Sequence, residues 1–373
     1  MLLILTLMVS LITSLIFKNT RIIGAIGFSV LAWLAGSADG RTTTDYQVYQ
    51  THYYALGSEV SPFEKGYTVL SEYFNNLGFS YSDFRLIFAF CAFAILFFGV
   101  LLFTNNVAMF TWIYGSTVFF NDVTQIRNLM MIAMIILGCG LFIKSNLIIK
   151  LLGIAAIVLS TQFHDLGFLF IMITPIYFIP KKYITKALGL VVGISLLVTM
   201  IIKIFGSSGV TNLIMRGLGA FSSRTDSVNN VQSHFSRGTS LSTIFLIGVT
   251  VLLVLYLSTS FTTYIQENMN INANKLKILY SGVFVSVFTL PLILLSPDYS
   301  RISRNAFLFF IIIIVIYYSG IINKKMLVKN RTILLIVFLA LFTYIHTTIW
   351  GPEYQNSIPY IARIKDSNES SGD

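Results

Sequence analysis

Residues 37–83 read SADGRTTTDYQVYQTHYYALGSEVSPFEKGYTVLSEYFNNLGFSYSD and interrupt a chain that is otherwise almost entirely apolar. Three pairs in this stretch have the spacing of a helix capping box: Thr44 with Gln47, Ser61 with Glu64, and Ser80 with Asp83. In such a box the hydroxyl side chain accepts a hydrogen bond from the backbone N–H three residues later. We therefore predict that the segment contains several helix starts and is folded.

The middle of this segment has the pattern of one amphipathic helix. Pro62 stands at a position where a first helical turn tolerates proline. Apolar residues then recur every three or four positions: Phe63, Tyr67, Leu70, Phe74 and Leu77. Gly78 follows at the position where a helix would end. The spacing predicts a helix over about residues 62–77 that lies on a surface.

The preceding stretch is rich in rings and hydrogen-bonding groups: Asp45, Tyr46, Tyr49, His52, Tyr53 and Tyr54. Two interpretations remain open. Tyrosines gather in the aromatic belt at a membrane interface, with acids capping the helices. Alternatively, the tyrosines form a platform for carbohydrate, because each offers a flat apolar face to a sugar ring and a hydroxyl to its edge.

Composition places the chain in a membrane. Of its 373 residues 55% are hydrophobic and 11% are charged, against the roughly 25% charged share of soluble domains. Cys91 and Cys139 lie within apolar runs, which favours packing over a disulfide or a zinc site. The net charge of +10 comes mainly from lysines and arginines in short connectors, as the positive-inside rule requires, so a nucleic-acid partner is not expected.

We predict an all-α, polytopic membrane protein with about twelve spanning helices and short interfacial helices in the 37–83 segment. The expected spans are at about 1–17, 22–36, 84–103, 107–120, 128–143, 149–163, 166–180, 186–205, 242–260, 277–296, 304–322 and 332–350. Basic connectors alternate with them on one side, taken as the cytoplasm, so the polar segments fall outside. Residues 1–356 are predicted to form a single transmembrane domain, and 357–373 a disordered tail.

The first polar cluster outside this segment runs from Asn121 to Asn128. At 100° per residue its amides and Thr124 share one helical face, with Arg127 at the edge. A single arginine at the end of a span usually extends its charge to the interface. Because several polar groups enter the membrane with this one, the cluster favours a polar cavity.

A second polar pair, His164 and Asp165, lies between two expected spans. His164 is either a satisfied helix-end histidine or a proton carrier and donor to a sugar or phosphate oxygen, held by the adjacent acid. The long loop 206–241, which contains Arg224, is either a flexible linker or a basic lid over an anionic lipid headgroup.

The start of the next-to-last expected span carries two arginines. The spacing of Arg301, Arg304 and Asn305 places them on one face of a helix. Guanidinium groups at a helix N-terminus oppose its dipole, so an anion should lie nearby. Asp298 supplies one such anion, and a diphosphate is the other, because arginine binds phosphate with two parallel donors.

These blocks occur in an order that resembles the EpsG-like branch of Wzy-type polysaccharide polymerases. The motifs are Thr44-Asp45-Tyr46 with Tyr49, Phe63-Glu64-Lys65-Gly66-Tyr67, Gln125-Ile126-Arg127-Asn128, Phe163-His164, and Arg301 with Arg304. The resemblance covers about residues 30–325. The chain departs from the family pattern at Thr43, where glycine is common, and at Asn128.

The resemblance implies a GT-C-like enzyme at the outer face of the bacterial cytoplasmic membrane, serving exopolysaccharide or capsule synthesis. It would transfer a growing glycan from undecaprenyl diphosphate to the non-reducing end of the next lipid-linked unit. Expected partners are the lipid-linked donor and acceptor, membrane lipids, a chain-length regulator and a flippase. No metal or other cofactor is expected.

The resemblance also assigns roles to residues. Asp45 and His164 are the preferred bases for the acceptor hydroxyl, ahead of Glu64. The remaining candidates bind substrate, with the first three forming a diphosphate clamp: Arg127, Arg301, Arg304, Gln125, Tyr46, Tyr49, Asn305 and Arg224.

Other classes of membrane protein make different predictions. A transporter or flippase of lipid-linked sugars should carry charges near mid-span and on both sides of the membrane. An acyltransferase that modifies polysaccharide should place its histidine near a cytoplasmic donor. A ligase that moves finished glycan would look much like a polymerase.

Overall fold

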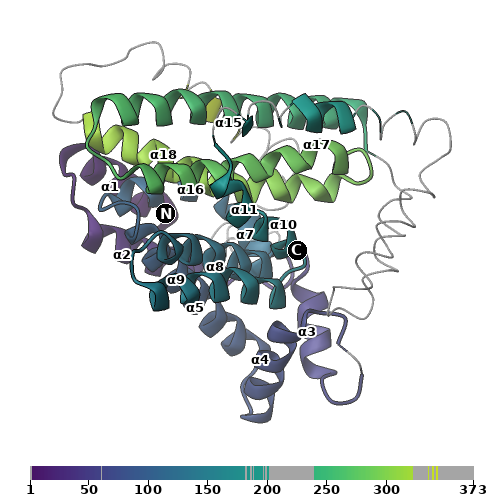
Figure 1. Cartoon of the computed structure of the whole chain (residues 1–373). Coiled ribbons are helices and arrows are strands. Elements are labelled where there is room, and N and C mark those ends of the chain that lie inside the picture. Colours follow the sequence, from purple (N-terminus) through teal and green to yellow (C-terminus); the bar gives the residue numbers. More distant parts are fainter. Residues whose placement is uncertain are drawn as a thin grey trace, which may run out of the picture. The chain divides into compact units, whose positions relative to one another are not determined.

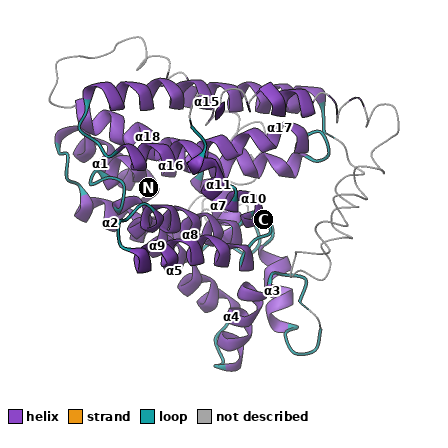
Figure 2. Cartoon of the chain, in the orientation of Figure 1, coloured by secondary structure: helices purple, strands orange, loops and turns teal. Residues whose placement is uncertain are grey.

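The computed structural model describes residues 2–59, 61–180 and 239–321 and, outside these, residues 183, 184, 187, 189–195, 197, 200, 335, 338, 339 and 342. Across these residues the secondary structure is helical, with no strand and a single isolated bridge between Leu56 and Glu59 (Figure 2). The predicted all-α class is therefore confirmed for the described part of the chain. The loop 206–238 and the tail 357–373 lie outside it.

The chain divides into two compact units. The first contains residues 1–59, 66–164 and 314–373, and the second contains residues 60–65 and 165–313.

The first unit is built from packed apolar helices: α1 (Leu2–Ile16), α2 (Arg21–Gly36), α5 (Tyr81–Leu101), α6 (Val107–Thr117), α7 (Phe119–Thr124), α8 (Ile126–Phe142), α9 (Leu147–Leu159) and the 3₁₀ turn η1 (Ser160–Gln162). Helix α5 packs against both α2 and α8, and α8 also packs against α9 (Figure 1). At the α8–α9 crossing, a Cβ on Gly138 would lie 2.6 Å from the carbonyl oxygen of Gly153. The close approach of these two backbones therefore requires glycine.

Two short helices, α3 (Tyr46–Tyr54) and α4 (Lys65–Asn76), form within the 37–83 segment. Gly78 ends α4 with φ of +83°, and the N–H groups of Gly78 and Phe79 donate to the carbonyls of Asn75 and Phe74. This is the pattern of a Schellman motif, which satisfies the last carbonyls of a helix. The predicted stop at Gly78 is confirmed, while the helix begins at Lys65 rather than at Pro62.

Of the three predicted capping boxes, only that of Ser80 and Asp83 forms. Helix α3 starts after Asp45, whose side chain makes no capping hydrogen bond, so the box at Thr44 and Gln47 was wrong. The box at Ser61 was also wrong, because α4 begins only at Lys65, so Ser61 does not precede the first helical residue; the Ser61 hydroxyl accepts from the N–H of Phe63. That bond forms a local turn instead of a helix start.

The second unit contains α10 (Gly167–Ile171), α11 (Ile173–Phe178), α15 (Leu241–Asn268), α16 (Ala273–Phe284), η2 (Val285–Phe288), α17 (Thr289–Leu292), η3 (Pro297–Tyr299) and most of α18 (Ser300–Ile321). Helix α16 packs against α11 and the long α15. Phe261 of α15 stacks on Phe310 of α18, with ring centroids 6.3 Å apart. Aromatic packing thus fixes α18 within this unit.

Four helices in the described part are long and apolar enough to cross a membrane: Tyr81–Leu101, Leu241–Asn268, Ala273–Leu292 and Pro297–Gly320. Five shorter apolar helices accompany them, at Leu2–Ile16, Arg21–Gly36, Ile126–Phe142, Leu147–Gln162 and Gly167–Phe178. These ranges overlap predicted spans. Half of the span predicted at 186–205 and most of that at 332–350 lie outside the described residues, so the number of about twelve stays a prediction.

Candidate functional site

The polar cluster at 121–128 lies at a helix break. Gln125 has φ of −111° and ψ of 58° and separates α7 from α8. The predicted continuous helical face was therefore wrong: Asn121 and Thr124 belong to α7, whereas Arg127 and Asn128 form the first turn of α8. All of these residues are buried, together with Gln125.

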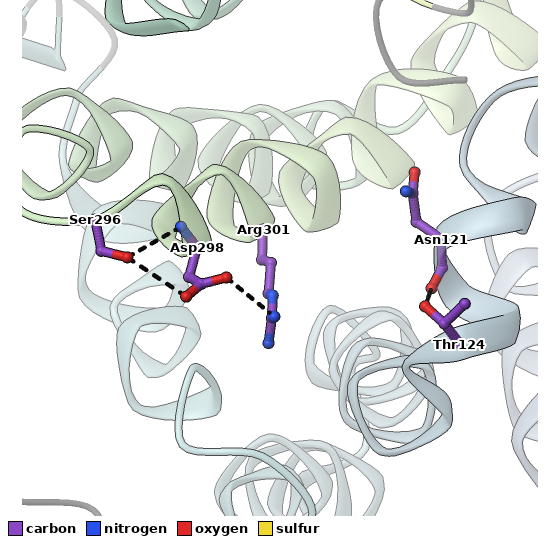
Figure 3. Close-up of polar contacts among 5 residues, drawn as sticks. All are labelled: Asn121, Thr124, Ser296, Asp298 and Arg301. Atoms are coloured by element: carbon purple, nitrogen blue, oxygen red, sulfur yellow. Dashed lines mark hydrogen bonds and ion pairs between the residues drawn. The ribbon is translucent and has the colours of Figure 1, made fainter. Parts of the chain in front are cut away.

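Hydrogen bonds hold the short helix α7 in place. Thr124 Oγ1 donates to the carbonyl oxygen of Asn121 at 2.8 Å (Figure 3). The Tyr114 hydroxyl on α6 donates to Asp122 Oδ2 at 2.9 Å, and Asp122 is fully buried. A buried carboxylate in this position needs such partners, so α6 and α7 are linked by a polar contact inside an apolar unit.

Arg127 lies between two tyrosine rings. Its guanidinium carbon is 5.1 Å from the ring centroid of Tyr49 and 5.6 Å from that of Tyr67. Only 5% of the residue is exposed, so its charge is buried among protein atoms. The fold thus brings together Arg127 and Tyr49, which the sequence had assigned to substrate binding. The two cation–π contacts orient the guanidinium.

A second buried arginine, Arg85 of α5, was not among the candidate residues predicted from the sequence. It is 1% exposed, and its guanidinium carbon lies 5.1 Å from the ring centroid of Tyr46. Its Nε and Nη2 donate to the carbonyls of Ala35 and Val123, and Nη1 donates to the Tyr81 hydroxyl at 3.3 Å. The sequence feature that could have identified Arg85 is that it is a lone arginine near the start of an apolar run.

The tyrosines of the 37–83 segment point mostly inward. Tyr46, Tyr49, Tyr53 and Tyr67 are each at most 8% exposed, while Tyr54 is 58% exposed. The first four therefore do not form the exposed carbohydrate platform that was one interpretation of this stretch. Burial raises the pKa of Tyr67 well above its usual value, with smaller opposing effects of Arg127 and Arg85, so its hydroxyl is protonated at neutral pH.

The three candidate bases have different surroundings. Asp45 is half-buried and has a left-handed backbone, with φ of 66°, directly before the buried ring of Tyr46. The neighbouring departure from the family pattern, Thr43, is buried. His164 is half-buried just after η1, and its backbone N–H donates to Ser160. Asp45 and His164 thus belong to the first unit and remain partly accessible.

Glu64 differs from these two because it is fully buried. In the second unit its Oε1 accepts a hydrogen bond of 3.2 Å from the backbone N–H of Asp165. It therefore acts as a structural acceptor that joins the start of α4 to the chain before α10.

The start of α18 carries the second set of arginines. Ser296 and Asp298 bond each other, and Arg301 Nη2 donates to Asp298 Oδ1 at 3.2 Å (Figure 3). Asp298 is thus an anion for Arg301, one of the two predicted alternatives. Arg304 is 5% exposed and Asn305 is fully buried, whereas the Arg301 side chain is 28% exposed.

Each unit therefore contains a guanidinium group in the first turn of an apolar helix, Arg127 in α8 and Arg301 in α18, where the helix N-terminus favours an anion. Arg224, the remaining predicted site residue, lies outside the described residues. Within the described ranges, no three His, Cys, Asp or Glu side chains gather where they could hold a metal ion.

Comparison with known proteins gives one match. A model described as the EpsG family matches residues 3–362, nearly the whole chain. No curated protein and no solved structure matches.

Proposed function

The chain belongs to the EpsG family, which is associated with polysaccharide polymerase-like proteins, and on this premise we propose that it polymerises lipid-linked oligosaccharides. The growing glycan would leave undecaprenyl diphosphate and join the non-reducing end of the next lipid-linked unit. The reaction would take place at the outer face of the bacterial cytoplasmic membrane. The family and the apolar helices indicate a membrane protein of polysaccharide synthesis, and the reaction is our proposal.

The observation that carries the proposal is the setting of Arg127. A guanidinium buried in a membrane helix is costly, and intramembrane charges of this kind usually serve a function. Arg127 is in the first turn of α8, where N–H groups lack intrahelical carbonyl partners and the helix dipole favours an anion. Two tyrosine rings fix its orientation. A diphosphate offers the charge and the acceptor oxygens that such a group binds.

The arginines of α18 have similar chemistry. Asp298 accepts from Nη2 of Arg301, which leaves the other N–H groups of that guanidinium for a ligand. Arg304 lies one turn further into the helix and is buried. We assign these two arginines, together with Asn305, to binding the diphosphates of the lipid-linked substrates.

The proposed reaction forms one glycosidic bond and breaks one glycosyl–phosphate bond. A base removes the proton of the acceptor hydroxyl, whose oxygen attacks the anomeric carbon of the donor. Asp45 or His164 takes this role in our proposal, because both are partly accessible whereas Glu64 is buried and bonded to Asp165. The arginines stabilise the charge of the departing undecaprenyl diphosphate.

Analysis of lipid-linked glycans in a deletion strain tests this function. We expect single repeat units on the lipid carrier and no long polymer, with restoration by the native gene but not by Arg127→Ala. The exposed Lys144→Ala variant is the matched control and should restore polymer. Full-length polymer lacking side groups in the deletion strain would instead identify a modifying enzyme.

A further inference from the structure

Arg85 is a buried charge that the proposed reaction does not use. It is the fifth residue of α5, is 1% exposed, and has no carboxylate within ion-pair distance among the described residues. A charge in this setting is strongly unfavourable unless other groups compensate it. Its partners therefore indicate why the residue is present.

Two of these partners are carbonyls at helix C-termini. Ala35 lies in the last turn of α2, and Val123 in the last turn of α7. Carbonyl groups there lack intrahelical donors and carry the negative end of the helix dipole. The positively charged Arg85 side chain thus caps the C-termini of both α2 and α7.

The bond to Val123 explains how the break at Gln125 is tolerated. In a continuous helix the Val123 oxygen would accept from the N–H of Arg127, four residues later. In the described structure Arg85 is the hydrogen-bond donor to that oxygen. The guanidinium replaces the lost helical bond and so stabilises the backbone turn that starts α8 and places Arg127.

The other side of Arg85 holds the turn that carries Asp45. Its guanidinium lies over the ring of Tyr46, which also contacts the ring of Tyr81 edge-on at 4.9 Å. A Cβ on Gly40 would lie 2.8 Å from the Tyr46 ring, so the backbone at Gly40 also packs closely against this ring. Asp45 precedes this fixed ring directly.

We propose that Arg85 is a positioning residue that sets the placement of Asp45 relative to Arg127. The Arg85 guanidinium, which is on α5, contacts Tyr46 directly after Asp45 and also bonds Val123 just before the helix break that precedes Arg127. The effect of this positioning on catalysis rests on the proposed function. Its structural part, the link between residues 41–50 and 119–130, is independent of which reaction occurs.

Three variants separate charge from geometry. Arg85→Lys keeps the charge but cannot bond two carbonyls and a hydroxyl in the same plane. Arg85→Ala removes the group and leaves space for a guanidinium ion. Arg21→Ala is the matched control, because Arg21 is an exposed arginine of the same unit whose side chain bonds, among the described residues, only Asn105.

In reconstituted vesicles with lipid-linked repeat units, we expect kcat to fall about 100-fold for Arg85→Ala and Arg85→Lys, since a displacement of about 1 Å has such an effect. KM should change by less than about threefold, because Arg85 does not contact substrate. Added guanidinium should restore kcat of Arg85→Ala but not of Arg85→Lys. Native kcat in either variant, or loss without rescue, would overturn the proposal.

Hydrogen exchange by mass spectrometry gives a readout besides activity. In Arg85→Ala we expect faster exchange confined to residues 41–50 and 119–130, reversed by guanidinium and absent in Arg21→Ala. Unchanged exchange there, or equal acceleration across the whole first unit, contradicts the positioning role. If the native protein forms no polymer, the proposed function fails while this measurement still decides the structural link.

Discussion

Arg127 and Arg85 are both buried in the first unit, and the guanidinium of each lies against tyrosine rings. Arg85 donates to two backbone carbonyls and a tyrosine hydroxyl, which fix three sides of its guanidinium. Arg127 is in the first turn of α8, where the helix dipole favours an anion, and its guanidinium lies against the rings of Tyr49 and Tyr67. At the scale of single residues, we therefore propose that Arg85 positions the backbone and that Arg127 binds the ligand.

Substitutions of Arg127 should separate charge from the two-donor geometry. Losing one charged hydrogen bond to a partly desolvated phosphate costs on the order of 1.5 to 3 kcal/mol, roughly a 10- to 150-fold loss. We expect Arg127→Lys to lose about this much polymerisation rate, and Arg127→Ala to lose more. The rate should be measured in vesicles at equal protein abundance. Native rates for both variants would exclude Arg127 from the site.

Tyr49 should act through its ring rather than its hydroxyl. A cation–π contact is worth about 0.5 to 2 kcal/mol, which corresponds to about a 2- to 30-fold change. We therefore expect Tyr49→Phe to retain native activity and Tyr49→Ala to lose activity by that factor. If Tyr49→Phe is as impaired as Tyr49→Ala in the same assay, the hydroxyl has a separate role.

The sequence could predict Arg127 because several polar neighbours surround it in an apolar context. It could not predict Arg85, because the carbonyls of Ala35 and Val123 come from two distant helices and carry no side-chain signal. The local pair of Asp298 and Arg301 was predictable as one alternative, since three residues separate partners on one helical turn. The link from Glu64 to Asp165 joins residues far apart in sequence and was not predictable.

At the scale of elements, the end of α4 depends on the backbone freedom of Gly78. Its φ of +83° costs an L-residue energy, although no atom lies within 4 Å of a Cβ placed there. We expect Gly78→Ala to lower the free energy of unfolding by about 1 kcal/mol through strain alone, and Gly78→Asn to lower it less. Thermal unfolding in detergent measures this difference. The matched control is Gly193→Ala, which has equal space and no positive φ; an equal loss there would contradict the explanation.

The 37–83 segment shows why spacing alone was insufficient for helix starts. Ser80 caps α5 because its chain enters in an extended conformation and the Asp83 carboxylate can reach back. At Asp45 the backbone is left-handed, so the preceding threonine is not at a capping position. The amphipathic pattern and Gly78 placed α4 correctly to within three residues at its start, because both signals are local.

At the scale of the whole molecule, the predicted orientation places the 37–83 segment outside and the 144–150 connector inside. In a variant lacking Cys91 and Cys139, a cysteine at exposed Ser58 should react with an impermeant maleimide in intact, wall-free cells. A cysteine at exposed Ser145 should react only after the cells are permeabilised. The reverse pattern would invert the orientation and move the proposed site to the cytoplasm.

Hydrophobicity predicted the helical class and the approximate ranges of most described helices, because lipid exposure requires long apolar segments. It did not predict the interruption at Gln125 or the short α10 and α11, because breaks inside protein depend on tertiary partners such as Arg85. The functional class came from the order of short motifs along the chain, and the match over residues 3–362 confirms the family.

The most direct test of the central proposal uses the purified protein in vesicles with synthetic, undecaprenyl-diphosphate-linked repeat units as the only glycan. The proposal predicts a ladder of oligomers on lipid and one undecaprenyl diphosphate released per glycosidic bond formed, with both products lost in Arg127→Ala. Repeat units that cross the membrane or acquire a substituent while remaining single would contradict it.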